Sequence, residues 1–351
     1  MRTTTGSEAT DTLPGEVVDA VVIGGGAAGL NGALMLARSR RSVVVVDSGA
    51  PRNAPAVGVH GLLGLDGIPP AELYGRGRAE VRRYGGLVVA GEVATAEPAP
   101  PADDGDLRFS VTLTDGRTVR ARRVLVATGL RDELPAVPGL AEHWGRSVVH
   151  CPYCHGWEVR DQPIGVLAVG PASLHHALLF RQLSDDLVYF SRGTELDDGT
   201  RARFAARDIT VVDTRVAEVV RGEGGGVAGV RLVDGQVVAR RVLAVAGTLH
   251  ARVEGLAGLR LPMEDVPGGL GRRVAAGMAG ATAVPGVWVA GNATDPMAQV
   301  GSAAAAGALA GAHINAVLAT ADTDAALRAR PSPVAAADAA ALEGSAASRQ
   351  S

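Results

Sequence analysis

The residues best suited to chemistry are Cys151 and Cys154, which stand three positions apart, with His155 directly after them. They are the only cysteines in the 351-residue sequence. Two thiols at this spacing can form a disulfide and exchange it with another thiol. The pair could instead supply half of a zinc site, or together with His155 match the attachment motif of a c-type haem.

The rest of the sequence favours a redox pair. Histidines 150, 155, 175 and 176 lie nearby, but no second Cys-x-x-Cys completes a zinc site, so we predict that no metal is bound. Haem is attached outside the cytoplasm, and residues 1–15 are polar, without the apolar stretch of a secretory signal. We therefore expect a cytoplasmic protein, in which a Cys-x-x-Cys is more often catalytic than structural.

Histidines near the pair are candidates for proton transfer. Imidazole has an ordinary pKa near neutrality, so His155 could take and return a proton during thiol exchange. His175 and His176 stand at the start of a predicted helix, and one of the two could face the redox centre. The sequence leaves their role open.

Composition excludes several classes of partner and mechanism. The formal net charge is −3, aromatic residues make up 3% of the chain, and no run of basic residues occurs, which argues against nucleic acid. The apolar runs are of strand length and none approaches the 18 or so residues that cross a membrane. All 34 basic residues are arginines, so a catalytic lysine is excluded.

A strand, a glycine turn, a helix and a second strand are predicted near the start of the chain. They cover residues 17–23, 24–29, 27–39 and 42–47, an arrangement typical of a doubly wound parallel sheet. The turn reads Gly24-Gly25-Gly26-Ala27-Ala28-Gly29 and fits G-x-G-x-x-G. Glycines allow the tight turn, the approach of a pyrophosphate and close helix packing, and the helix start supplies amide donors.

We therefore predict dinucleotide binding at this turn, although a purely structural glycine turn is the alternative in a chain with 47 glycines. An acid at the end of the second strand, 18 residues after the turn, could hold a ribose hydroxyl. The turn does not decide between FAD and NAD(P). The predicted ligands are Gly24, Gly26, Ala27, Ala28, Gly29 and Asp47.

A second block repeats the pattern with a poorer turn. A strand is predicted over residues 163–170, a helix over 174–183 and a strand over 187–190. In the turn between the first two, Pro171 lacks an amide donor, Ala172 replaces a glycine, and His175 stands where a small residue should pack. We expect this block to be retained for fold and dimer packing more than for NAD(P)H.

Further elements complete the predicted order. We expect helices over residues 68–84 and 302–318, and strands that include 107–113, 119–127, 209–212, 227–233, 237–246 and 287–290. Residues 1–15 are predicted to be a disordered leader. From residue 319 the sequence loses its periodicity, and residues 321–351 are predicted to be a disordered tail.

Through these motifs and their order, residues 17–318 resemble the low-molecular-weight thioredoxin reductase family. The resemblance implies an α/β protein with two Rossmann-like, doubly wound domains. An FAD-binding domain would comprise residues 16–130 and 247–320, and an NAD(P)-type domain with the Cys-x-x-Cys would be inserted as residues 131–246. Family members are homodimers with non-covalent FAD. Besides the glycine turn, the implied FAD contacts are Ala127, Thr128, Gly129, Gly291, Asn292, Gln299 and Val300.

Departures from the reductases point to one branch. His155 stands where reductases have an aspartate, Asn292 replaces the aspartate of their final FAD motif, and the arginine-rich site for a 2′-phosphate is missing. This combination resembles the dithiol oxidases of antibiotic biosynthesis, which close the disulfides of holomycin and gliotoxin. By that resemblance Cys154 would lie nearer the flavin and Cys151 would exchange with substrate.

The resemblance implies an FAD-dependent oxidase that forms a disulfide in a small-molecule dithiol and passes the electrons to oxygen, giving hydrogen peroxide. Residues 51–65 could cover the flavin. An NAD(P)H-dependent reductase of a thioredoxin-like protein is the alternative on the same fold. A redox-responsive binding protein is a third hypothesis. The sequence does not identify the dithiol, nor does it say whether the substrate is a metabolite or a protein.

Overall fold

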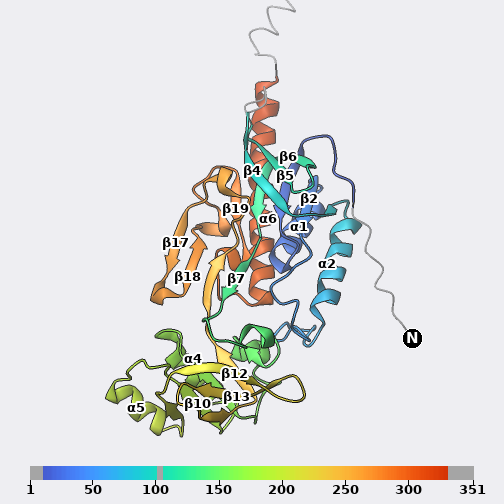
Figure 1. Ribbon diagram of the computed structural model, residues 1–351. Helices are drawn as coiled ribbons and strands as arrows, with labels where there is room; N and C mark the ends of the chain where they lie inside the picture. Colours follow the sequence, from blue (N-terminus) through green and yellow to red (C-terminus); the bar gives the residue numbers. More distant parts are fainter. Residues whose placement is uncertain (1–10, 101–105, 331–351) are drawn as a thin grey trace, which may run out of the picture.

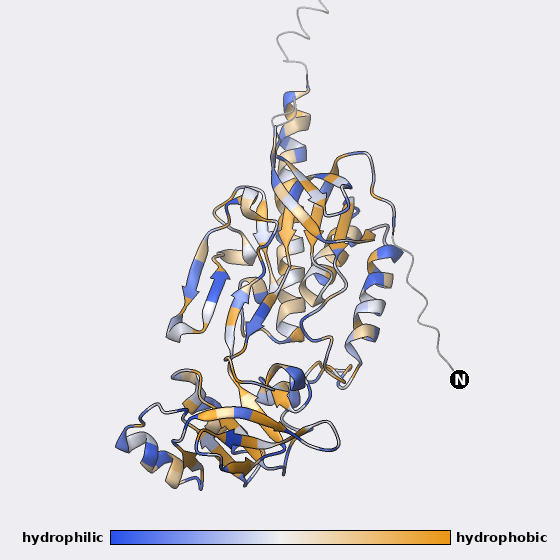
Figure 2. Ribbon diagram, viewed as in Figure 1, coloured by the Kyte–Doolittle hydropathy of each residue, from blue (hydrophilic) through white to orange (hydrophobic). Residues whose placement is uncertain are grey.

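Two parallel sheets of valine-rich strands, each with helices packed against it, organise the chain (Figure 1). The computed structural model describes residues 11–100 and 106–330. We call the sheet nearer the two ends of the chain, with its helices, the first body, and the sheet built from the middle of the chain the second body. Figure 2 shows apolar residues concentrated on the strands at the centre of the first body.

The sheet of the first body is parallel in its centre, with the order β3-β2-β1-β6-β19. Near-continuous runs of Val, Ile and Leu form these strands, because both faces of the sheet are covered. Two further strands, β4 and β5, pair antiparallel beside the start of β6. The strands are β1 (Val18–Ile23), β2 (Val43–Asp47), β3 (Leu87–Ala90), β4 (Val93–Ala99), β5 (Arg108–Leu113), β6 (Thr118–Val126) and β19 (Val287–Val289).

Helices α1 (Ala27–Arg38), α2 (Pro70–Arg83) and α6 (Val300–Arg328) pack on one face of this sheet. Helices α1 and α6 cross very closely, because small residues line both. A Cβ atom at Gly307 would lie 1.9 Å from the backbone oxygen of Ala28. The start of α6 is therefore held beside the start of α1, although about 270 residues separate them in the sequence.

The second body contains a fully parallel sheet in the order β11-β10-β9-β15-β8, with helices α3, α4 and α5. An antiparallel sheet, β12-β13-β14, packs against it. The elements are β8 (Val148–Val149), α3 (Pro152–His155), β9 (Ile164–Leu167), α4 (Ala172–Phe180), β10 (Leu187–Phe190), α5 (Asp198–Ala205), β11 (Thr210–Val212), β12 (Val216–Arg221), β13 (Val227–Leu232), β14 (Val237–Ala239) and β15 (Val242–Val245).

Two antiparallel strands connect the bodies. The chain leaves the first body through β7 (Leu130–Glu133) and returns through β16 (Thr248–Ala251). They belong to a four-stranded sheet with β17 (Met263–Val266) and β18 (Gly271–Val274). Short 3₁₀ helices lie at Ala141–His143, Ala257–Leu259, Pro267–Gly269, Met278–Gly280 and Gly291–Ala293.

The prediction of one strand over residues 237–246 is wrong, because the chain changes partners in the middle. The amide of Arg240 donates to the backbone oxygen of Ala228 in β13, whereas the amide of Arg241 donates to that of Pro163, directly before β9. Two separate strands result, β14 in the antiparallel sheet and β15 in the parallel one.

The predicted disorder is also wrong where the structure describes the chain ends. Helix α6 continues to Arg328, ten residues beyond its predicted end, and its Asp322 pairs with Arg41 at 2.6 Å and with Arg122 at 2.7 Å. Near the start, the carboxylate of Asp11 accepts from the amide of Val88 at 2.7 Å. Residues 1–10 and 331–351 lie outside the described part of the chain.

Helix α6 is long and apolar enough to cross a membrane by length and composition alone. The prediction that no segment approaches that length is therefore wrong for α6. Its apolar character comes mostly from alanine and glycine, and its buried residues pack against α1 and the first sheet.

Candidate active site

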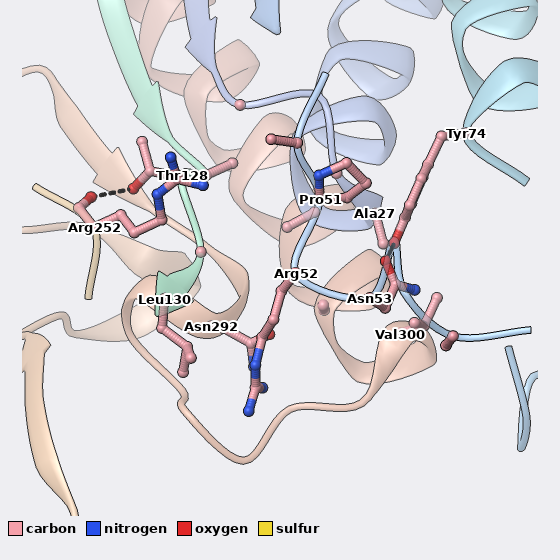
Figure 3. A pocket seen from close by; sticks show the side chains of 18 of the residues that line it. Ala27, Pro51, Arg52, Asn53, Tyr74, Thr128, Leu130, Arg252, Asn292 and Val300 are labelled. Atoms are coloured by element: carbon pink, nitrogen blue, oxygen red, sulfur yellow. Dashed lines mark hydrogen bonds between the residues drawn. The ribbon is translucent and has the colours of Figure 1, made fainter. Parts of the chain in front are cut away.

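A cavity lies where the two bodies meet, and segments from many parts of the chain line it, five of which concern the predicted site. These are the glycine turn before α1, the loop after β2, the segment from β8 to α3 that holds the cysteines, the ends of the connecting strands, and the start of α6. Figure 3 shows Thr128 and Arg252 on one side of the cavity and Asn53 and Tyr74 on the other, with Arg52 between them.

Each glycine of the first turn is explained by a different structural requirement. Gly24 has φ +111°, and a Cβ there would lie 2.4 Å from the backbone oxygen of Ala127. A Cβ at Gly29 would lie 1.8 Å from the oxygen of Gly24, so this glycine is required for packing. A Cβ at Gly26 would meet no protein atom within 4 Å. Gly26 therefore leaves room on the cavity side that packing of the protein does not explain.

Two helix N-termini border this space. Gly26 precedes α1 and Gln299 precedes α6, and no side chain caps either helix. Gly26, Ala27, Gln299 and Val300 all line the cavity, together with Ala28. Free amides and the positive ends of two helix dipoles favour an anionic group such as a pyrophosphate. The predicted ligands in both turns are thus brought together, and they fit a dinucleotide.

Asp47 ends β2 and lines the same cavity, as predicted for a ribose ligand. Its Oδ1 accepts from the amide of Gly49 at 2.9 Å, and Oδ2 lies 3.8 Å from Arg78. A Cβ at Gly25 would lie 2.3 Å from this carboxylate. Gly25 occupies the variable position of the G-x-G motif and was not among the predicted ligands. The structure explains this glycine, because the carboxylate of Asp47 packs against it.

The turn after β6 supplies three further predicted residues, Ala127, Thr128 and Gly129, and all line the cavity. The hydroxyl of Thr128 donates to the backbone oxygen of Arg252 at 2.6 Å, visible as the dashed line in Figure 3. The hydroxyl therefore holds the end of β16, the strand on which the chain returns from the second body.

Asn292 closes a loop at the cavity edge. Its side-chain amide donates to the backbone oxygens of Asp295, Pro296 and Ala298, at 3.0, 3.3 and 2.9 Å. Gly291 before it has φ +70°. An aspartate could not make these donations, since an ionised carboxylate only accepts hydrogen bonds. The asparagine thus has a structural reason of its own, besides lining the cavity.

Cys151 and Cys154 are joined by a disulfide, with Cα atoms 5.2 Å apart, and both line the cavity. Cys151 precedes α3, and the amide of Cys154 donates to its Sγ at 3.1 Å. A hydrogen bond of this kind would stabilise a thiolate on Cys151 after reduction. The second body therefore presents the disulfide to the cavity that the first body lines with its glycine turn.

His155 also lines the cavity, and both of its ring nitrogens are buried without a hydrogen-bond partner in the described chain. Burial lowers the pKa of His155, and His60 and His150 lower it further, against the opposing effect of Glu158. The imidazole is therefore neutral at neutral pH.

Of the two histidines predicted as candidates to face the redox centre, neither lines the cavity, and only His176 contacts the backbone beside the cysteine pair. His175 is exposed on α4. His176 is buried behind the cysteine motif, where its Nε2 donates to the backbone oxygen of His150 at 2.5 Å. Burial lowers the pKa of His176 to about 4.

The loop predicted to cover the flavin, residues 51–65, does line the cavity, and it contacts both the connecting strand β7 and the second body. Arg52 binds Asp132 on β7. Nε2 of His60 lies 3.4 Å from the carboxylate of Glu158, just after α3. Sequence reasoning missed both basic residues, because their partners are 80 and 98 residues away along the chain.

Side chains of the second body form hydrogen bonds with the backbone at the second glycine turn. The hydroxyl of Ser173 accepts from the amides of Val169 and Gly170, at 2.9 and 3.4 Å. Arg192, the arginine after β10, donates to the backbone oxygen of Ala168 at 3.1 Å. Ser173 thus engages two amides of the turn, and Arg192 binds a backbone oxygen at the end of β9.

No cluster of three or more metal-ligating side chains occurs within residues 11–100 and 106–330. The histidines near the cysteine pair therefore do not complete a zinc site in this part of the chain.

The sequence pattern described as pyridine nucleotide-disulphide oxidoreductase matches residues 18–309. The chain belongs to this family. Thioredoxin reductase tcpT of Claviceps purpurea (strain 20.1) is 38% identical over 262 residues, which are 72% of this chain and 80% of the relative. The predicted resemblance to thioredoxin reductases is thereby confirmed.

Solved structures agree with this assignment. HlmI has 45% identity and a TM-score of 0.83, over 91% of this chain and 98% of HlmI. An oxidoreductase from Agrobacterium tumefaciens has 34% identity and a TM-score of 0.79, over 87% and 99%. The predicted α/β fold with two Rossmann-like units is confirmed. As a pyridine nucleotide-disulphide oxidoreductase, the protein is a flavoprotein enzyme of thiol–disulfide exchange.

Proposed function

We propose that this oxidoreductase is an FAD-dependent dithiol oxidase, which forms a disulfide in a small-molecule dithiol with oxygen as the terminal acceptor. The observation that carries the proposal is a contrast between the two glycine turns. The first leaves open space at Gly26 in the cavity that the cysteine pair also lines, whereas in the second Ser173 engages two backbone amides and Pro171 supplies none. These features support a flavin at the first turn and disfavour a nicotinamide at the second.

In this proposal the FAD-binding domain comprises residues 16–130 and 247–320, and residues 131–246 form the inserted domain with the disulfide. The amides at the starts of α1 and α6 would hold the pyrophosphate, and Asp47 would hold the adenosine ribose. When bound, FAD would accept two electrons from the reduced cysteine pair and pass them to oxygen, which with two protons becomes hydrogen peroxide.

The cysteines perform the exchange with substrate. A substrate thiolate attacks Sγ of Cys151, the Cys151–Cys154 bond breaks, and Cys154 leaves as a thiolate. The second substrate thiolate then attacks the substrate sulfur of the mixed disulfide, which closes the product and releases Cys151. The substrate loses two electrons and two protons. His155, neutral and facing the cavity, is a candidate to carry a proton.

The alternative, a reductase driven by NAD(P)H, needs a nicotinamide site in the second body. Pro171 has no amide hydrogen, and the turn that contains it is closed by Ser173. No acidic residue follows β10 directly, where one would hold a ribose diol, since Ser191 and Arg192 stand there. These observations favour the oxidase.

Anaerobic absorbance of the protein-bound flavin tests the proposal. The purified protein is mixed separately with NADPH, NADH and dithiothreitol. Bleaching by the dithiol alone, reversed by air with release of peroxide, is the expected result. Cys151→Ser and Cys154→Ser should keep the flavin and lose both dithiol bleaching and turnover. Rapid bleaching by either nicotinamide would refute the oxidase, as would full activity of a cysteine variant.

A cytoplasmic location and a homodimeric state remain predictions from the sequence. Sedimentation velocity of the purified protein would measure the oligomeric state directly.

A further inference from the structure

We propose that His150 is a catalytic base, which takes the proton of the substrate thiol that attacks Cys151. The inference rests on the proposed dithiol oxidation and adds a residue that the cysteine motif does not contain. His150 follows β8, immediately precedes Cys151, and lines the cavity together with the disulfide. A base at this position would lie beside the sulfur that the substrate attacks.

The hydrogen bonds of His150 determine its tautomer. Nδ1 lies 3.2 Å from the backbone oxygen of Val245, at the end of the neighbouring strand β15. A carbonyl oxygen only accepts, so Nδ1 carries the hydrogen and the neutral ring keeps its lone pair on Nε2. Within residues 11–100 and 106–330 no donor is bonded to Nε2. The acceptor needed for a thiol proton is therefore available.

Access distinguishes His150 from His155. Both ring nitrogens of His155 are buried. Nε2 of His150 also has no hydrogen-bond partner in the described chain, but it is not buried. Of the two histidines beside the disulfide, His150 is therefore the one whose basic nitrogen is reachable from the cavity. The side chain is otherwise well enclosed, which keeps the ring in one orientation.

Burial and the neighbouring Arg52 favour the neutral form of His150. Burial lowers its pKa, and Arg52 lowers it further, while the Val245 carbonyl and Asp132 raise it. The other titratable neighbours are His176, whose ring centroid is 5.9 Å away, and His155. A neutral imidazole at pH 7 can accept a proton, and an imidazolium could not.

His176 acts as a positioning residue for this base. Its Nε2 carries the hydrogen, because it donates to the backbone oxygen of His150 at 2.5 Å. Its own Nδ1 is consequently a buried acceptor without a donor in the described chain. The hydrogen bond from Nε2 anchors the backbone from which both His150 and Cys151 project.

The step balances without a further reagent. The S–H bond of the substrate breaks and its proton passes to Nε2 of His150. The resulting thiolate forms a bond to Sγ of Cys151 with its electron pair, and the pair of the Cys151–Cys154 bond leaves on Cys154. The disulfide is the oxidant, and its reoxidation by FAD and oxygen belongs to the proposed function.

His150→Asn tests the inference, because the amide of asparagine can still donate to Val245 but offers no imidazole Nε2. Reduction of the disulfide by dithiothreitol is followed anaerobically by rapid quenching and alkylation of the new thiols. At pH 7 the variant should be slower by about 10²–10⁴-fold. At about pH 9.5, above the ordinary thiol pKa of about 8.5, the thiol ionises unaided and the two rates should converge.

Controls separate a base from a structural role. His175→Asn changes an exposed histidine and should leave the rate unchanged at every pH. If His150→Asn does not fold, as judged by flavin content and thermal melting, His150→Gln carries the same expectation. A rate lowered equally at pH 7 and pH 9.5, or not lowered at all, would overturn the inference. Failure of dithiothreitol to reduce the wild type would instead overturn the proposed function, and the base with it.

Discussion

The guanidinium of Arg52 binds the carboxylate of Asp132 through two hydrogen bonds, of 2.7 Å from Nε and 2.5 Å from Nη2. Arg52 belongs to the loop that lines the cavity, and Asp132 lies on β7, which leads into the second body. The Asp132 side chain is only 5% exposed, so its charge depends on this partner. The pair thus ties the cavity loop to the connection between the bodies.

Replacement of Arg52 by glutamine should destabilise the protein, because Asp132 would keep a buried charge without its partner. The expected loss is about 2 kcal/mol, which lies between the losses typical of exposed and of buried ion pairs. Urea denaturation would measure the change in free energy of unfolding. Arg52→Gln combined with Asp132→Asn should recover part of the loss. Additive losses in the double variant would show that the two side chains are not coupled.

Gly26→Val should separate flavin binding from folding. A Cβ at Gly26 meets no protein atom within 4 Å, so the fold should lose only about 1 kcal/mol for a poorer N-cap. Flavin binding should weaken about tenfold or more, which corresponds to about 1.4 kcal/mol or more. Flavin fluorescence during titration of the apoprotein measures the affinity.

The matched control is Gly224→Val, because Gly224 likewise has open space and lies outside the cavity. It should bind flavin as the wild type does. Normal flavin affinity in Gly26→Val would exclude the dinucleotide assignment of this turn.

Asn292→Asp should lower stability by about 2 kcal/mol at pH 7, because a carboxylate would face three backbone oxygens that now receive hydrogen bonds. The difference from the wild type should shrink as the pH falls and the new carboxyl is protonated, since the protonated acid can donate. Urea denaturation at several pH values would measure this difference in the free energy of unfolding.

Asn53→Asp provides the control for Asn292→Asp in the same cavity. The Asn53 oxygen accepts from the hydroxyl of Tyr74 at 3.0 Å, and a carboxylate can do the same. If Asn53→Asp lost as much stability as Asn292→Asp, the added negative charge would be the cause, and not the lost hydrogen-bond donations.

His176 should make stability depend on pH. Its pKa is about 4 in the folded protein against an ordinary 6.5, so the unfolded chain binds the proton more readily. The stabilisation is fully present above about pH 6.5 and is lost progressively as the pH falls to about 4. The full loss corresponds to about 3 kcal/mol.

A non-titrating side chain removes this dependence. His176→Gln can keep the donation to His150, and its free energy of unfolding should therefore fall less than that of the wild type between pH 6.5 and 4. Exposed His175→Gln should follow the wild type. Identical pH dependence in His176→Gln and the wild type would contradict the assignment.

Much of the fold could be predicted because its signals are local. Buried parallel strands such as β2 are continuous runs of valine, and the turn before α1 carries a glycine pattern within six residues. The cysteine pair is likewise a local motif. The predictions failed for chain segments whose conformation depends on partners that are distant in the sequence. Arg240 and Arg241 divide one valine-rich run between two sheets, and α6 extends because Asp322 meets Arg41 and Arg122.

The sequence by itself therefore determined the parallel strands, the dinucleotide turn and the redox pair, since each depends on residues a few positions apart. The tertiary structure alone decided that Gly26 opens onto the same cavity as the disulfide, and that the second turn is closed by Ser173. It also decided which ring nitrogen of His150 is left as an acceptor, because Val245 occupies the other from 95 residues away. Side-chain chemistry is local, but the hydrogen-bond partner that selects a tautomer is brought there only by folding.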